Sequence, residues 1–256
     1  MSGDGVLAPA VPEAKSHPGI EILLVLGISL GRSAVYSILS IVNSLTMEVP
    51  LNQQSTSMNS SVTPDRPWLD LAYQVANIAF PIVPALLALY FLRLSRDRIG
   101  FDLKRPAFDA LLGLGIAAGI GIPGLVLYFA ARAAGLNLNV QPANLAANWW
   151  TVPVLVGAAA MNGILEEVVI IGFFFAKAAA LNWRPWVIIA ASALIRGSYH
   201  LYQGFGGFAG NIAMGVIFGL IYLKTRRVGP LVAAHTFIDI AAFVGYSALA
   251  PLTDWF

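Results

Sequence analysis

Hydrophobic residues dominate the chain in long runs, and short segments between the runs gather most of the polar and charged residues. A run of about 17–25 apolar residues is long enough to cross the hydrocarbon core of a bilayer as a helix. The pattern therefore predicts an all-α, polytopic bundle of about seven transmembrane helices. The expected segments are residues 20–45, 69–92, 108–131, 152–176, 186–203, 208–223 and 228–249.

Composition supports a membrane protein. Hydrophobic residues make up 58% of the chain and charged residues only 11%, whereas a soluble domain carries about a quarter charged residues. The chain contains no cysteine, which excludes a disulfide framework and a thiolate metal site. The formal net charge of +2 is too small to indicate a nucleic-acid partner, so the partners that we expect are membrane lipid and a membrane-associated peptide or protein.

The distribution of basic residues predicts an orientation. With the N-terminus in the cytoplasm, eleven Lys and Arg residues fall in inner segments and two, Arg66 and Arg132, in outer ones. We expect an integral protein of the plasma membrane of a bacterium-like host, with the N-terminus inside and the C-terminus outside. Residues 1–18 lack the features of a cleaved signal peptide and are interpreted as a disordered cytoplasmic tail, followed by a single transmembrane domain over residues 19–256.

Ionisable residues within the apolar runs are concentrated in the C-terminal half of the chain. Such groups cost free energy in hydrocarbon unless they have partners, so each is a functional candidate. Residues four apart share one face of a helix, and the stripes on three helices can satisfy one another only by converging on one pocket. The candidates are Glu166 and Glu167 in the fourth segment, Arg196 and His200 in the fifth, and His235 and Asp239 in the seventh.

This set of groups is suited to the activation of water. A shielded carboxylate can act as a general base and then as a general acid. The two imidazoles can hold the water or an oxyanion, or they can bind a metal ion that activates the water. Counting about 1.5 Å per helical residue, we expect the pocket between the middle of the bilayer and its cytoplasmic side.

At these residues the chain resembles the CAAX protease and bacteriocin-processing (CPBP) family, which includes the type II CAAX prenyl endopeptidases. The family shows the motifs E-E-x-x-x-R, F-x-x-x-H and H-x-x-x-N on successive spans. This chain has Glu166-Glu167 with Ile171 at the arginine position, then Arg196 to His200, then His235 to Asp239. The resemblance covers residues 151–246, the expected catalytic core.

The resemblance implies an intramembrane endopeptidase, which in this family cleaves near a CAAX-like or membrane-anchored terminus. Glu166 would activate the water, His200 would hold the same water, and Glu167 would support them. His235 and Asp239 would bind a metal or stabilise the oxyanion. Two forms stay open: a metalloprotease in which Glu166, His200 and His235 hold a divalent metal such as zinc, and a glutamate-dependent enzyme without one.

The replaced motif arginine leads to a hypothesis about Arg196. An arginine four residues after Glu167 would lie on the face of that carboxylate and neutralise it, but Ile171 cannot. Arg196 is one helical turn from His200, so we expect it to supply the cation from the neighbouring span. The alternatives are a catalytically inactive relative that acts as a membrane binding, immunity or scaffold protein, and a proton-coupled transporter, against which the lack of an inverted repeat counts.

Other polar and small residues in the spans receive structural interpretations. Asn162 and Ser198 are expected to hydrogen-bond between helices, and Tyr199, about 100° around the helix from His200, to make packing contacts. Glu21 and Arg32 form a candidate structural ion pair. The small residues at Gly115 and Gly119, and at Gly215 and Gly219, are expected to let helices approach closely.

Overall fold

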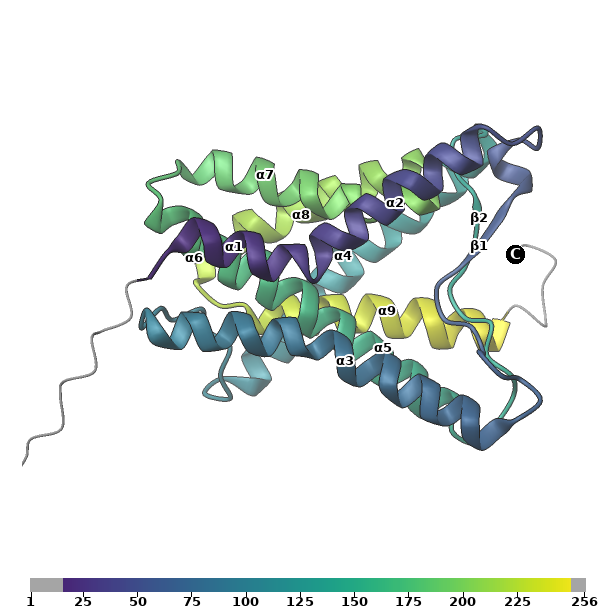
Figure 1. Ribbon diagram of the computed structural model, residues 1–256, viewed down its shortest axis with the longest axis horizontal. Helices are drawn as coiled ribbons and strands as arrows, with labels where there is room; N and C mark the ends of the chain where they lie inside the picture. Colours follow the sequence, from purple (N-terminus) through teal and green to yellow (C-terminus); the bar gives the residue numbers. More distant parts are fainter. Residues whose placement is uncertain (1–15, 250–256) are drawn as a thin grey trace, which may run out of the picture.

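A computed structural model describes residues 16–249 of the chain, most of which are helical (Figure 1). The predicted tail, residues 1–18, therefore lies outside the described residues except at its end, where Pro18 begins the first helix. The helices are α1 Pro18–Gly27, α2 Leu30–Leu45, α3 Pro67–Leu94, α4 Pro106–Ala133, α5 Thr151–Glu166, α6 Phe174–Ala180, α7 Pro185–Ser198, α8 Phe205–Thr225 and α9 Gly229–Leu249.

Short elements connect these helices. A π-helical segment, η2 (Glu167–Phe173), joins α5 to α6, and the 3-10 turns η1 (Leu51–Gln53) and η3 (Leu201–Gln203) follow α2 and α7. Two strands, β1 (Ser55–Ser57) and β2 (Asn139–Gln141), pair in parallel. Four helices, α1, α3, α4 and α7, begin with a proline, which suits the first helical position because its missing N–H would have no partner there.

The prediction of an all-α polytopic bundle is confirmed. Among the described residues, five helices are long and apolar enough to cross a membrane, with α5, η2 and α6 counting as one, and α1 with α2 forms a sixth candidate bent by 49°. The remaining expected segment, 186–203, contains α7, which has only 14 residues. At about 1.5 Å per residue, α7 is shorter than the roughly 30 Å hydrocarbon core.

The two ends of the bundle differ in character. Successive passes of the chain run in opposite directions along the bundle, so the links α3–α4, α6–α7 and α8–α9 lie at one end and the strands β1 and β2 at the other (Figure 1). The first end carries most of the basic residues of the chain, which we call the basic end. The second end is called the strand end.

The pass Thr151–Ala180 forms the centre of the bundle. In its most apolar window 61% of the residues are buried, whereas no other candidate span exceeds 28%. Close packing between α7 and α8 depends on the glycines of α8, because a Cβ at Gly215 would come within 2.9 Å of Ala193. The same expectation is wrong for Gly115 and Gly119, where an added Cβ would meet nothing within 4 Å.

Candidate active site

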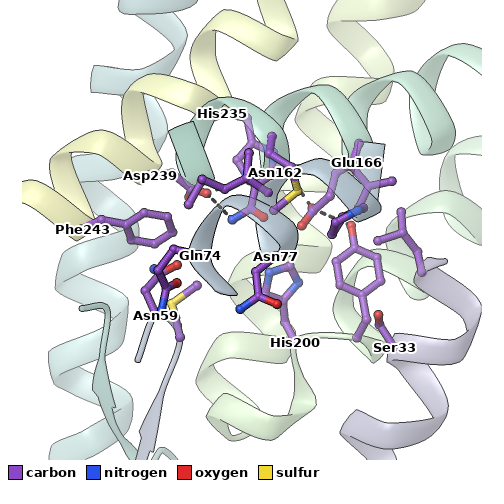
Figure 2. A pocket seen from close by; sticks show the side chains of 18 of the residues that line it. Ser33, Asn59, Gln74, Asn77, Asn162, Glu166, His200, His235, Asp239 and Phe243 are labelled. Carbon is purple, nitrogen blue, oxygen red and sulfur yellow. Dashed lines mark hydrogen bonds and ion pairs between the residues drawn. The ribbon is translucent and has the colours of Figure 1, made fainter. Parts of the chain in front are cut away.

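The predicted site residues converge from three passes of the chain (Figure 2). Glu166 ends α5 and Glu167 begins η2, Arg196 lies in the last turn of α7, and His235 lies in α9. These four side chains are in direct contact through hydrogen bonds and ion pairs. The other two candidates, His200 and Asp239, line the same cavity as Glu166 and His235.

Arg196 neutralises the paired glutamates. Its guanidinium is completely buried, and its Nη2 donates to both carboxylate oxygens of Glu167 at 2.7 Å. Nη1 donates to Glu166 Oε2 at 3.2 Å, and the guanidinium carbon lies 5.4 Å from the centre of the Phe218 ring. The expected contact between Arg196 and the glutamates is therefore present, while the motif position, Ile171, is buried among apolar side chains.

Glu166 and Glu167 have different surroundings although they are neighbours in sequence. Glu167 is completely buried, and its Oε1 also accepts a hydrogen bond of 2.7 Å from His235 Nδ1. Glu166 faces the cavity, and its Oε2 accepts the hydroxyl of Tyr199 at 2.7 Å. Because its hydrogen bonds go to Oε2, the Oε1 atom of Glu166 is the oxygen that a water molecule in the cavity can reach.

The two imidazoles are fixed by different partners. A backbone carbonyl only accepts hydrogen bonds, so the contact of 3.0 Å between His200 Nδ1 and the Arg196 carbonyl requires the proton on Nδ1. This tautomer leaves Nε2 of His200 with a lone pair for a ligand in the cavity. His235 is flanked by carboxylates, with Glu167 at Nδ1 and Asp239 Oδ1 at 3.7 Å from Nε2.

The polar groups adjoin a cavity of about 470 Å³. Its lining reaches Met58, Asn59 and Ser60 in the segment between β1 and α3, so it extends toward the strand end of the bundle. The site was expected between the middle of the bilayer and the cytoplasmic side, whereas the cavity continues from the glutamates toward the strand end. The difference arises because His200 follows the last turn of α7, at the far end of that helix from its start at the basic end.

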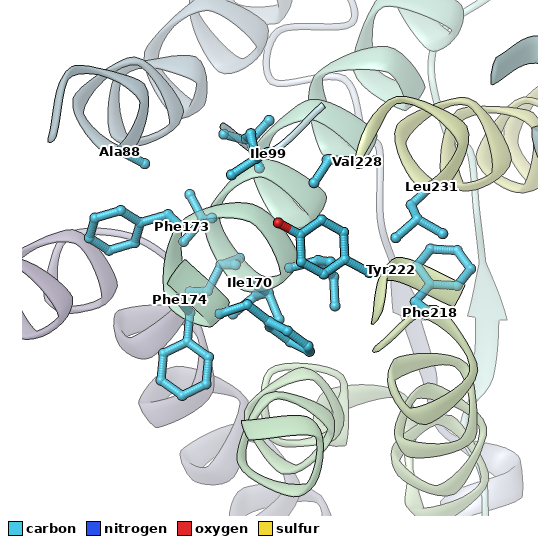
Figure 3. Close-up of a cluster of buried hydrophobic side chains, with 14 of the residues drawn as sticks. Ala88, Ile99, Ile170, Phe173, Phe174, Phe218, Tyr222, Val228 and Leu231 are labelled. Carbon is cyan, nitrogen blue, oxygen red and sulfur yellow. The ribbon is translucent and has the colours of Figure 1, made fainter. Parts of the chain in front are cut away.

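The local sequence explains how the glutamates are held. Residues 168–171 are Val-Val-Ile-Ile, and such β-branched side chains crowd the preceding turn of an α-helix. Here the helix widens into η2, whose residues are all buried, and Ile170 and Phe173 pack in the apolar cluster beside the site (Figure 3). Gly172 permits close contact with the segment that follows α3, because a Cβ at position 172 would come within 2.6 Å of the Ile99 side chain.

Tyr199 was missed as a site residue. Its ring is buried in the apolar cluster, which agrees with the expected packing contacts, and its hydroxyl also donates to Glu166. The hydrogen bond to Glu166 was not expected because a continuous α-helix was assumed, whereas α7 ends at Ser198 and the following residues turn into η3. A preceding glycine, Gly197, and the polar run after it were the available signals that the helix stops.

The structural interpretations of the other polar residues have mixed outcomes. Asn162 does bond between helices, since its Nδ2 donates to Asp239 Oδ2 at 2.9 Å, but Ser198 bonds to the Leu194 carbonyl of its own helix. The prediction of an ion pair between Glu21 and Arg32 is wrong. Glu21 instead pairs with the buried Lys177 at 2.8 Å, because α1 packs against α6.

Three of the side chains could hold a metal ion. Ligand atoms of Glu166, Glu167 and His235 lie within 4.8 Å of one another, and carboxylate and imidazole donors suit zinc. This group contains Glu167 in place of the expected His200. A bound cation would have to compete with Arg196, which already occupies both oxygens of Glu167.

One comparison with known proteins identifies the region that holds the site. The sequence model of the type II CAAX prenyl endopeptidase family, Rce1-like, matches residues 148–241. These residues are Rce1-like. The match confirms the resemblance to the CPBP family, and the Rce1-like region contains all six predicted site residues together with Tyr199. No curated protein and no solved structure gives a significant match to the chain.

Proposed function

We propose that the protein is an intramembrane endopeptidase in which Glu166 activates the attacking water. The observation that supports this most is the division between the two glutamates: Glu167 is sealed by Arg196 and His235, while Glu166 faces a cavity beside His200. An enzyme that uses water inside a membrane needs one carboxylate that water can reach and a polar framework that holds it. The Rce1-like family is a family of peptidases, which agrees with this chemistry.

The residues suggest the following sequence of proton transfers. Glu166 Oε1 accepts a proton from a water molecule that also donates to His200 Nε2, and the hydroxide attacks the carbonyl carbon of the scissile peptide bond. The tetrahedral oxyanion lies toward His235, whose Nδ1 is bound to Glu167 and whose Nε2 donates to the oxyanion when both ring nitrogens carry a proton. Glu166 then passes its proton to the leaving amine, which breaks the C–N bond and returns the carboxylate to its initial state.

Arg196 supports an active enzyme over an inactive relative. An enzyme that had lost the motif arginine without replacement would keep two carboxylates side by side with no cation, which is costly in a buried site. Here Nη2 of Arg196 donates to both oxygens of Glu167 and Nη1 donates to Glu166, so one guanidinium from α7 bridges the two carboxylates. We propose that Arg196 positions Glu167, and through His235 the rest of the site, without touching substrate.

A divalent metal such as zinc is the alternative to Arg196 as the cation of this site. If bound by Glu166, Glu167 and His235, it would supply a Lewis acid and a metal-bound water. The hydrogen bonds of Glu167 favour Arg196 as the cation of the site instead. We therefore propose the glutamate-dependent form, in which no step depends on a metal.

The substrate that we propose is a membrane-associated peptide or protein cleaved near its membrane-anchored or CAAX-like end. If the basic end of the bundle lies in the cytoplasm, as the positive-inside rule predicts, the cavity extends toward the outer side of the membrane. Peptides presented from that side would then be the better substrates. Vesicles in which the protein has one known orientation, with peptide added to either side, test this point.

A cleavage assay tests the proposed function. Purified protein in liposomes is given membrane peptides with and without a prenyl group, and wild type is compared with Glu166→Gln and His200→Ala. We expect both variants to lose activity, since each removes a contact to the attacking water, and the product ends to identify the cleaved bond by mass spectrometry. Undiminished cleavage by both variants would exclude the enzyme that we propose.

A further inference from the structure

The face of α3 that lines the cavity is polar although α3 is an apolar helix. Asp70, Gln74, Asn77 and Pro81 are spaced four, three and four residues apart, which places them on one side of the helix. Gln74, Asn77 and Pro81 line the cavity opposite α5 and α9. None of these residues belongs to the Rce1-like region, so the family match assigns them no role.

The first two residues of this face have partners in the chain. Asp70 Oδ1 accepts hydrogen bonds from the N–H groups of Val62 and Thr63, at 2.7 and 3.1 Å. Gln74 Nε2 donates to the Ser60 carbonyl at 3.0 Å. Both side chains hold the segment between β1 and α3 against the helix, which explains their polarity without a ligand.

Asn77 differs, because its side chain has no hydrogen-bond partner among the described residues. Its side chain is exposed and lies about a third of the way along a candidate span, where an amide facing hydrocarbon would be costly. It lines the same cavity as His200 and Glu166, and Figure 2 shows its amide on the cavity wall. The position is therefore suited to an amide that binds something inside the cavity.

Pro81 adds a second polar group at the same position. In an α-helix the carbonyl of residue 77 accepts the N–H of residue 81, but proline has no N–H. The Asn77 carbonyl thus lacks its usual donor on the face where Pro81 itself lines the cavity. Together the side-chain amide and this carbonyl offer donors and acceptors within one residue.

The charges around the cavity restrict the ligand. Its ionisable lining residues are acids, imidazoles and tyrosines, and no Lys or Arg of the described chain lines it. A carboxylate or phosphate would be repelled by Asp239, and Arg196, the guanidinium beside Glu166, is already paired with both glutamates. A neutral group with alternating donors and acceptors fits, and the backbone of an extended peptide is such a group.

We infer that Asn77 and its carbonyl bind the backbone of the substrate peptide and align it with Glu166. Asn77 is thus a positioning residue on the wall of the cavity that α3 forms, outside the Rce1-like region. The alignment of the peptide with Glu166 rests on the proposed function. The contact between Asn77 and the peptide backbone requires only that a peptide binds in the cavity. The segment in the cavity would be internal to the peptide, with its C-terminal carboxylate outside.

Binding is measured first, on the Glu166→Gln background, where no cleavage removes the ligand. A fluorescent membrane peptide is titrated against this protein and against the same protein with Asn77→Leu, which keeps the size of the side chain but removes the amide. We expect the Kd to rise about tenfold, the effect of one or two hydrogen bonds. Asn43→Leu is the matched control, because Asn43 lies on α2 outside this cavity.

A substrate series then identifies the contact. Peptides with one backbone N-methyl group at successive positions are compared, and one position should bind more weakly to the protein that retains Asn77 but equally well to the Asn77→Leu protein. Pro81→Ala restores an N–H for the Asn77 carbonyl and should also weaken binding. Pro84→Ala is its control in the same helix, since Pro84 is buried away from the cavity and should have no effect.

The outcomes separate the inference from the proposed function. If Asn77→Leu leaves the Kd and the N-methyl profile unchanged, the backbone contact is wrong whether or not the protein cleaves peptides. If the variant weakens binding but the wild type cleaves no peptide, the contact stands and the peptidase proposal fails. If no peptide binds, both fail. In the cleaving wild type, Asn77→Leu should raise KM and change kcat little.

Discussion

Two of the ion clusters in the described part of the chain have a completely or almost completely buried cation, and their surroundings give them different roles. In the first, the completely buried Arg196 of α7 pairs with Glu166 and Glu167 of the central pass. In the second, Lys177 of α6 is only 1% exposed and pairs with Glu21 of α1 at 2.8 Å. Each cluster joins two passes of the chain, and each would be expected from hydropathy alone to mark a functional site.

Their surroundings differ. Lys177 is also held by the hydroxyl of Ser95 at 2.9 Å and the Phe91 carbonyl at 3.4 Å, and neither Lys177 nor Glu21 lines the cavity. The Arg196 cluster adjoins the cavity, and two imidazoles and a tyrosine complete it. A buried charge therefore indicates a catalytic site only when part of its network is left open to a ligand.

The largest expected effect comes from removing each cation. Arg196→Met leaves the buried Glu167 with His235 as its remaining partner, and Lys177→Met leaves Glu21 with hydrogen bonds but no cation. Each change removes the cation from a buried ion pair, so each should lower the free energy of unfolding by about 3–5 kcal/mol. Only Arg196→Met should also abolish cleavage in the fraction that remains folded. Thermal unfolding in detergent, read beside activity per folded molecule, checks this. Equal specific activities of the two variants would contradict the comparison.

The next prediction concerns the origin of the cation. Replacing Arg196 by Phe and Ile171 by Arg restores the family motifs, and the double variant should recover most of the activity that Arg196→Phe alone loses. The reason is that Glu167 would again have a guanidinium partner, now from its own helix. Cleavage rates of the two variants give the answer. A double variant without activity, beside an active Arg196→Phe protein, would show that Arg196 has another role.

A smaller effect is expected at Tyr199. Tyr199→Phe removes one hydrogen bond to Glu166 and leaves the ring in place, so the loss of kcat should be about tenfold with little change in the unfolding temperature. Tyr222→Phe is a suitable control, because Tyr222 is also buried but lies near Phe175 in the apolar cluster. A loss of stability equal to the loss of activity would make Tyr199 a structural residue only.

The smallest effect is expected from metal removal. Because Arg196 occupies Glu167, dialysis against a chelator should change neither the cleavage rate nor the unfolding temperature, and elemental analysis should find no stoichiometric zinc. In Arg196→Met the freed carboxylates should bind zinc more strongly than in the wild type. A large loss of wild-type activity that zinc restores would instead show that a metal belongs to the mechanism.

The sequence predicted the bundle well because long apolar runs have few alternatives to membrane helices. It also predicted that the six site residues converge and that Arg196 meets the paired glutamates, since costly groups in adjacent spans must meet. It could not predict Tyr199, whose place depends on where α7 stops, nor the partner of Glu21, because Lys177 lies 156 residues later and only the packing of α1 against α6 brings them together.

The depth of the site was also beyond the sequence. It depends on the tilt and start of α7, which hydropathy does not determine. The polar face of α3 was visible in the sequence only as isolated residues in an apolar run. Its role can be inferred only from the cavity that α2, α3, α5 and α9 line. That cavity forms because helices that are far apart in the sequence pack together.

The π-helical segment η2 has an evolutionary consequence. Such segments correspond to one additional residue within a helix, so the pass Thr151–Ala180 is two α-helices in different rotational phase. Removing one residue between 168 and 173 would turn α6 by roughly 100° relative to α5. Lys177 would then point away from Glu21 while Glu166 stayed in place. A single insertion or deletion in the gene could thus change which neighbour the α6 half of this pass contacts, independently of the half that carries Glu166.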